Sequence, residues 1–107
     1  MNTAEATKTI KLEYNKAIKL EHGNVAEMRK TNEGSNSQVV IKNLSSQNTI
    51  TISITLGKDG STQKIAPKEE LFFHDTPSDF DGKVLQIFNQ TSSQHAGTAE
   101  ITVNGVR

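Results

Sequence analysis

The 107-residue chain contains no cysteine and no tryptophan, and it has only one tyrosine and two prolines. Without cysteine it can form neither disulfide bonds nor thiolate metal sites, and it has no cysteine nucleophile. The shortage of aromatic rings removes most platforms on which nucleic-acid bases stack. Twelve basic residues balance twelve acidic ones, so we expect no electrostatic nucleic-acid binding.

Long apolar segments are absent as well. Met1–Lys8 has neither the basic region nor the apolar region of a secretory signal, so none is predicted. The longest apolar-rich run, Ile50–Leu56, alternates with threonine and serine and is too short to cross a bilayer. We therefore expect a soluble protein without membrane contacts.

Uncharged polar residues are abundant, with 9 Asn, 12 Thr, 9 Ser and 6 Gln. Such a surface is typical of β-proteins rather than helical ones. Leu, Ile, Val and Phe number 6, 9, 6 and 4, just above the level at which chains usually stay unfolded. The length and composition predict one domain, residues 1–107, with a thin core.

The clearest strand signal covers residues 48–56, where Ile50, Ile52 and Ile54 alternate with threonine and serine. A two-residue turn at Asp59-Gly60 then predicts a hairpin that places Ile54 opposite Ile65.

The first thirty residues allow more than one arrangement. A continuous strand over residues 8–22 would bury Lys16 at a cost. A hairpin with the loop 15–17 avoids that cost and is preferred. It pairs Tyr14 with Ile18, Leu12 with Leu20, Glu13 with Lys19, and Lys11 with Glu21.

A second three-residue loop is predicted at His22-Gly23-Asn24. It would place Leu20 opposite Ala26, Ile18 opposite Met28, and Lys19 opposite Glu27. A short helix beginning at Asn24 is the alternative, because Asn24 and Glu27 come close to a capping box.

Further strands are predicted over residues 38–44, 71–73, 83–90 and 98–104. Leu71-Phe72-Phe73 is apolar on both faces, which favours a central or doubly covered strand. Eight or nine short strands, no secure helix and no internal sequence repeat predict an all-β fold. We expect an antiparallel two-sheet β-sandwich, immunoglobulin-like or jelly-roll, with an open-ended barrel as the alternative.

Motifs with catalytic or metal-binding chemistry are weak. His22, His74 and His95 are too far apart in sequence to predict a zinc site. Asp79 and Asp81 resemble a calcium loop, but the EF-hand alignment would make Pro77 the first ligand. An irregular Ca²⁺ site formed with Asp75 stays open. No phosphate-binding loop or nucleophile elbow is present, so we predict no enzyme activity, no cofactor and no metal.

The chain resembles small immunoglobulin-like or jelly-roll sandwiches, among them accessory proteins of tailed-phage virions. The resemblance rests on VVIKNLSSQNTITISI from Val39, on QKIAPKEELFF ending at Phe73, and on the TAEITV strand that ends at Val103. It implies a β-sandwich and a capsid-decoration or head-fibre role, with no catalytic residues to transfer.

The functional prediction is thus a non-enzymatic virion structural protein, made in the host cytoplasm, that binds the major capsid protein or another virion protein. Because a chain without net charge has little colloidal repulsion, we also expect a homo-oligomer. The predicted contact loops are Glu33, Gly34, Ser35, Asn36 and Ser37, together with Thr91, Ser92, Ser93, Gln94 and His95. The alternative is a module that binds carbohydrate or a cell-surface partner, although sugars usually stack on aromatic rings.

Overall fold

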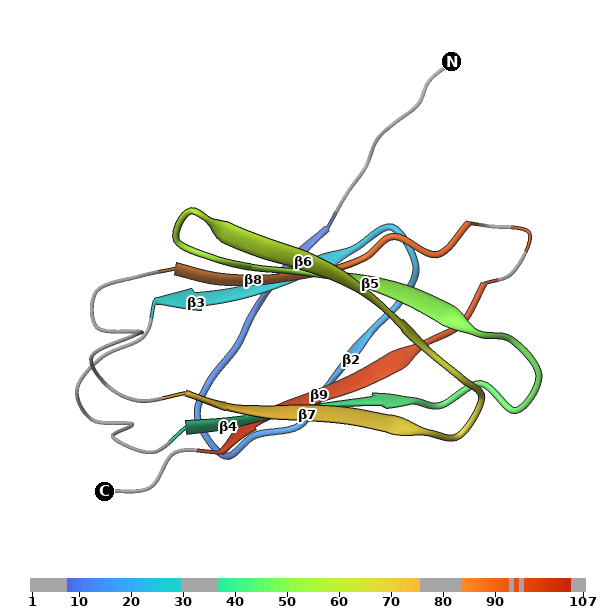
Figure 1. Ribbon diagram of the computed structural model, residues 1–107, viewed down its shortest axis with the longest axis horizontal. Helices are drawn as coiled ribbons and strands as arrows, with labels where there is room; N and C mark the ends of the chain where they lie inside the picture. The colour runs from blue at the N-terminus through green and yellow to red at the C-terminus, as the bar shows by residue number, and fades with distance from the viewer. Residues whose placement is uncertain (1–7, 30–36, 76–83, 93, 95, 105–107) are drawn as a thin grey trace, which may run out of the picture.

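The computed structural model describes residues 8–29, 37–75, 84–92, 94 and 96–104, which form nine strands in two sheets (Figure 1). Sheet A has the order β1-β3-β8-β5-β6, with bounds Thr9–Lys11, Val25–Arg29, Val84–Asn89, Ile50–Leu56 and Asp59–Ile65. Sheet B has the order β2-β9-β4-β7, with bounds Ile18–Leu20, Ala99–Asn104, Ser37–Asn43 and Glu70–Asp75. The predicted all-β, two-sheet sandwich is confirmed.

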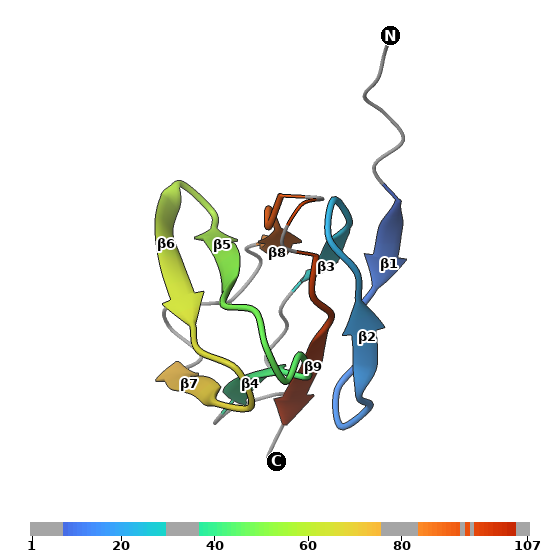
Figure 2. The same ribbon diagram turned by 90° about the vertical axis from the view of Figure 1, so that its right-hand side faces the viewer.

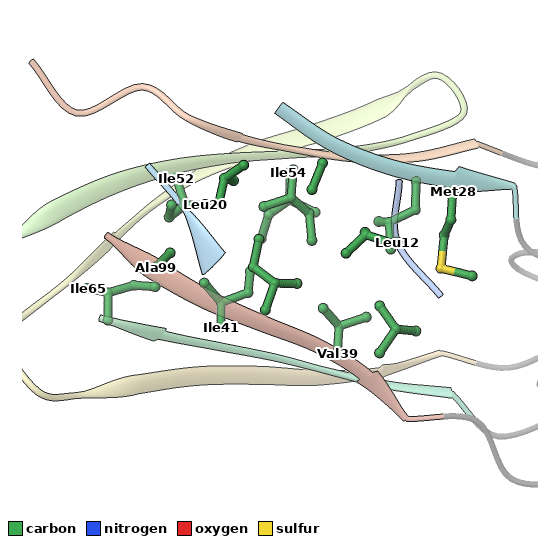
Figure 3. Close-up of a cluster of buried hydrophobic side chains, with 14 of the residues drawn as sticks. Leu12, Leu20, Met28, Val39, Ile41, Ile52, Ile54, Ile65 and Ala99 are labelled. Atoms are coloured by element: carbon green, nitrogen blue, oxygen red, sulfur yellow. The ribbon is translucent and has the colours of Figure 1, made fainter. Parts of the chain in front are cut away.

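The core lies between the two sheets and consists of the inward-facing residues of each strand (Figure 3). In β5, Ile50, Ile52 and Ile54 are buried, while the intervening Thr51 and Ser53 are only partly covered. This alternation follows from the pleat of a strand, which points successive side chains to opposite faces. Aliphatic side chains from both sheets meet there, with Leu20, Ile41, Leu85 and Ile101 fully buried.

The N-terminal region crosses between the sheets instead of forming the predicted hairpins. β1 pairs in parallel with β3 in sheet A, whereas β2 pairs with β9 in sheet B. Both predicted loops, 15–17 and 22–24, therefore connect strands of different sheets, and the pairings assigned to them are wrong. The helix alternative from Asn24 is also wrong, because Val25–Arg29 is a strand. Alternation shows which residues face inward, but not which sheet a strand joins.

The predicted charge pairs change with these pairings. Lys11 lies opposite Glu27, and Lys19 lies opposite Glu100. Opposite charges still face each other across neighbouring strands, as cross-strand pairing favours, but with other partners.

The hairpin of β5 and β6 is confirmed, but its predicted register is wrong. Leu56 lies opposite Asp59, and Ile50, not Ile54, lies opposite Ile65. The turn is therefore Gly57-Lys58, and Gly57 has a φ of 62°. A two-residue hairpin turn with a positive φ at its first position strongly prefers glycine there.

The strand β7 is an edge strand with an exposed side chain on one face, contrary to the prediction that it is central or covered on both faces. It pairs only with β4, and Phe72 is 58% exposed. Figure 2 shows β6 and β7 together on one side of the molecule, with β1 and β2 on the other.

The two halves of the sandwich share one pairing pattern. In sheet B, Asn43 lies opposite Ala99 and Ile41 lies opposite Ile101. The matching pairs in sheet A are Asn89 with Ile52 and Ile87 with Ile54.

Backbone hydrogen bonds repeat in the same way. The N–H of Leu44 donates to the Thr98 carbonyl at 2.9 Å, and that of Gln90 donates to the Thr51 carbonyl at 3.0 Å. Just before β7 and β3, the Asn43 N–H donates to Glu69 O at 2.9 Å and the Asn89 N–H to Asn24 O at 3.0 Å. The described strands within residues 24–56 thus match those within residues 69–103, with the roles of the two sheets exchanged. This repeat in pairing was missed because the two segments share little sequence beyond Asn-x-Ser-Ser and Asn-x-Thr-Ser.

Candidate functional site

Two connections between the sheets meet at one end of the sandwich, on the right of Figure 1. The first arch, residues 43–49, leads from β4 in sheet B to β5 in sheet A. The second arch, residues 90–98, leads from β8 in sheet A to β9 in sheet B, and its described residues are 90–92, 94 and 96–98. We call this region the arch end.

A buried asparagine holds the first arch in place. Asn43 is fully buried at the end of β4, and its Nδ2 donates to the carbonyls of Asn48 at 2.8 Å and Ile65 at 2.9 Å. Its Oδ1 accepts the N–H of Ser45 at 2.8 Å. Asparagine suits this position because its side chain can bond to the backbone two residues on while it donates twice.

The second arch has the same device at the end of β8. Asn89 is also fully buried, and its Nδ2 donates to the carbonyls of Leu20 at 3.0 Å and Gly97 at 2.9 Å. Its Oδ1 accepts the Thr91 hydroxyl at 2.7 Å and the Thr91 N–H at 3.3 Å. Each asparagine thus ties its own arch to a strand on the far side of the core, because buried polar groups must be hydrogen-bonded.

The two arches also bond to and pack against each other. Nδ2 of Asn48 donates to the Ala96 carbonyl at 3.1 Å. A Cβ on Gly97 would lie 2.6 Å from Cγ2 of Ile50 and 3.4 Å from Cβ of Ser45, so only glycine fits this contact. The arch end is therefore a fixed structure and not a pair of independent loops.

A polar groove of about 550 Å³ opens beside the second arch. It is lined by Gln47, Asn48, Thr49, Thr51, Lys64, Gln90, Thr91 and Ser92. Thr91 lies at the base of this groove and is only 7% exposed. Its hydroxyl accepts the N–H of Thr51 at 2.9 Å. Within the described part of the chain, no hydrogen bond involves the exposed side chains of Gln47, Gln90 or Lys64. The groove thus combines a fixed base with polar walls that are open to a ligand.

A second groove, of about 430 Å³, occupies the matching place in the other half. It is lined by Lys19, Glu21, Leu44, Ser45, Ala96, Gly97 and Thr98. Leu44, Ser45 and Thr98 correspond to Gln90, Thr91 and Thr51 of the first groove. The second groove contains both a lysine and a glutamate, whereas the described lining of the first contains Lys64 and no acidic residue.

The described residues of the two predicted contact loops lie at opposite ends of the sandwich. Ser37 is the first residue of β4, and Thr91 lies two residues after the end of β8, at the arch end. Residues 33–36, 93 and 95 lie outside the described part of the chain. Ser92 and Gln94 are exposed as expected, but Thr91 is buried, so its placement on an exposed loop surface is wrong.

The other candidates contribute no described site. His22 is exposed, and Asp79 and Asp81 lie outside the described residues. Among the residues that the structure describes, no group of three or more His, Asp or Glu side chains is arranged to hold a metal ion. None of the described segments is a helix long and apolar enough to cross a membrane.

The groove itself was missed from the sequence because its lining comes from separate segments, at 47–51, 64 and 90–92. No local pattern connects Lys64 to Gln90. The one available signal was the pair of Asn-x-Ser/Thr-Ser segments at the ends of two strands, since Asn at such a position often bonds to the backbone of a following turn.

No family model matches the chain, and no curated protein matches its sequence. A solved structure similar to it is the pre-peptidase C-terminal domain of collagenase from Bacillus anthracis, with a TM-score of 0.57 and 19% sequence identity. The match covers 97% of this chain and 100% of that domain. The two share a β-sandwich fold. The sandwich part of the predicted resemblance is therefore supported, while the phage-virion part stays a prediction.

Proposed function

We propose that this chain is a non-enzymatic β-sandwich module that binds a polar ligand in the groove beside the second arch. The observation that carries the proposal is the combination of a hydrogen-bonded base with walls of exposed amide, hydroxyl and ammonium groups. Its volume, about 550 Å³, lies in the range of roughly 300–1,000 Å³ in which small-molecule sites fall.

The chemistry of the lining supports binding and not catalysis. Amides and hydroxyls donate and accept hydrogen bonds but are poor proton-transfer groups near neutral pH. The described lining residues include no histidine or carboxylate that would activate Thr49 or Ser92 as a nucleophile. The collagenase match is named as a C-terminal domain of an enzyme, which agrees with an accessory module.

A glycan array probed with the labelled chain tests this function. We expect bound glycans, and we expect the double substitution Gln47→Ala/Gln90→Ala to remove that binding. Gln63→Ala is the matched control, because Gln63 is exposed on β6 but lies outside the groove lining. An array without bound glycans, or equal binding by the groove variant, would contradict the proposal.

A second candidate is the virion structural role predicted from the sequence, and the edge strand β7 favours it. Phe72 is 58% exposed there, and a cleft of about 250 Å³ between β6 and β7 is lined by Ile54, Ser61, Gln63 and Leu71. Apolar groups beside an edge strand suit a protein partner that adds a strand. Mass spectrometry of purified particles tests this role, and absence of the chain from them would exclude it.

A further inference from the structure

We propose that the groove beside the second arch selects saccharides that carry carboxylates, such as uronic-acid oligosaccharides, and that Lys64 pairs with the carboxylate. This inference rests on the proposed function and specifies its ligand class. Lys64 lies in the groove lining, the two grooves differ in charge, and the described lining of the first groove has no aromatic ring.

Lys64 stands on β6 directly opposite Thr51. Residues opposite each other in an antiparallel pair share one face of the sheet. Thr51 lies between the buried Ile50 and Ile52, so this face is the outer one, away from the core. Lys64 is exposed on this outer face and lines the groove, as does the exposed Thr49.

The grooves differ in charge although they match in position. The described lining of the first groove has Lys64 as its one charged side chain, whereas Lys19 and Glu21 offset each other in the second. A lone cation among neutral hydrogen-bond donors attracts a carboxylate, and charge-assisted hydrogen bonds are roughly twice as strong as neutral ones. The first groove thus favours an anion, and the second has no such preference.

The rest of the lining favours a sugar over a peptide. Amide and hydroxyl groups from Gln47, Thr49, Gln90 and Ser92 match the hydroxyl groups of a saccharide. The described lining contains no aromatic ring on which a neutral sugar would stack, and no large apolar side chain to anchor a peptide. Binding there must come from hydrogen bonds and charge, which an acidic sugar supplies together.

Isothermal titration calorimetry with trigalacturonic acid and with neutral galactotriose tests the inference. We expect the acidic trisaccharide to bind about tenfold more tightly in 20 mM NaCl, a difference equivalent to about 1.4 kcal/mol. We expect the difference to shrink in 200 mM NaCl, because salt screens exposed charges. Lys64→Gln should remove the preference without affecting the fold, and Lys64→Arg should keep it.

Two control variants locate the effect. Lys58→Gln makes the same charge change in the turn at the far end of β6, and Lys19→Gln makes it in the second groove. Both should retain the preference for the acidic trisaccharide. A loss with Lys19→Gln but not with Lys64→Gln would overturn the inference.

The remaining outcomes separate the inference from the proposed function. Equal binding of both trisaccharides, weakened by Gln47→Ala/Gln90→Ala, would leave the binding module standing and overturn the carboxylate preference. Binding of neither, together with an empty glycan array, would overturn both. A pentaglutamate peptide that binds as tightly as trigalacturonic acid would show that the groove recognises the carboxylate and not the sugar, and would overturn the saccharide assignment.

Discussion

The two arches have the same backbone pairing and the same buried asparagine, yet they close differently. In the first arch, the Ser45 hydroxyl accepts two N–H groups of its own loop, from Gln47 at 3.2 Å and Asn48 at 2.9 Å. In the second, the Thr91 hydroxyl turns inward to Oδ1 of Asn89 and accepts the N–H of Thr51 on β5. The Ser45 hydroxyl thus bonds within its own loop, whereas the Thr91 hydroxyl also bonds to a neighbouring strand.

This difference shows how one framework supports two different surfaces. The pairing of β4 with β9 and of β8 with β5 sets the position of each groove. The arch residues then decide its chemistry, since Gln90 borders the first groove where Leu44 borders the second. Substitutions in the arches therefore test whether the two arches contribute equally to the free energy of unfolding.

Replacing either buried asparagine is expected to lower the stability of the protein most. We expect Asn89→Ala to lower the free energy of unfolding by about 4 kcal/mol and Asn43→Ala by about 3 kcal/mol, since each leaves two carbonyls without their donor. Asn89 has the larger effect because its Oδ1 accepts two hydrogen bonds and that of Asn43 accepts one. Urea unfolding measures both values. A larger loss for Asn43→Ala would show that the Thr91 hydroxyl bond adds no stability.

The contact between the arches gives the next effect. Ala99 and Ile52 occupy matching positions in the two halves, so Gly97 and Ile50, each two residues earlier, match as well. These two matching residues pack against each other. Gly97→Ala should cost about 2 kcal/mol, because the added methyl group would press on the fully buried Ile50. Gly60→Ala is the control, since its Cβ would have ordinary contacts of 3.5 Å. Equal thermal unfolding midpoints for the two variants would contradict the interlocked arrangement.

Removing the Thr91 hydroxyl should cost more stability than removing the Ser45 hydroxyl. Thr91→Val keeps the shape of the side chain but removes the acceptor for Thr51 and the donor to Asn89, which should cost about 2 kcal/mol. Ser45→Ala should cost about 1 kcal/mol or less, because Ser45 is only partly buried. Thr91→Ser, which keeps the hydroxyl, should recover most of the loss in urea unfolding. Equal costs for Thr91→Val and Ser45→Ala would mean that the arches are closed with equal strength.

The smallest effect on stability is expected at the turn of the hairpin that joins β5 and β6. Gly57→Ala should cost about 1 kcal/mol, because its φ of 62° is unfavourable for a residue with a Cβ. Lys58→Ala in the same turn should change stability by less than about 0.5 kcal/mol. A neutral result for Gly57→Ala in urea unfolding would show that the turn relaxes to another type.

The sequence predicted the strands well and their arrangement only in part. Alternation is a local signal, so β4, β5, β8 and β9 were placed within two residues of their ends. The same signal cannot tell a hairpin from a crossing between sheets, which is why Leu12 and Leu20 were assigned to one hairpin. The hairpin register was wrong because Gly57 and Gly60 each offer a turn, and backbone conformation decides between them. The grooves depend on residues brought together by the sheets, and no local pattern contains that information.

The place of β9 has a consequence for how the chain folds during synthesis. β9 is the last described strand along the chain, yet it lies between β2 and β4 in sheet B. Until it leaves the ribosome, β2 has no described neighbour, and β4 pairs with β7 alone. Sheet B therefore cannot close before β9 has been made, and until then β2 and β4 each keep an edge that β9 later pairs. Because such edges pair readily with other chains, a nascent chain stalled before Ala99 should be the species most prone to aggregate.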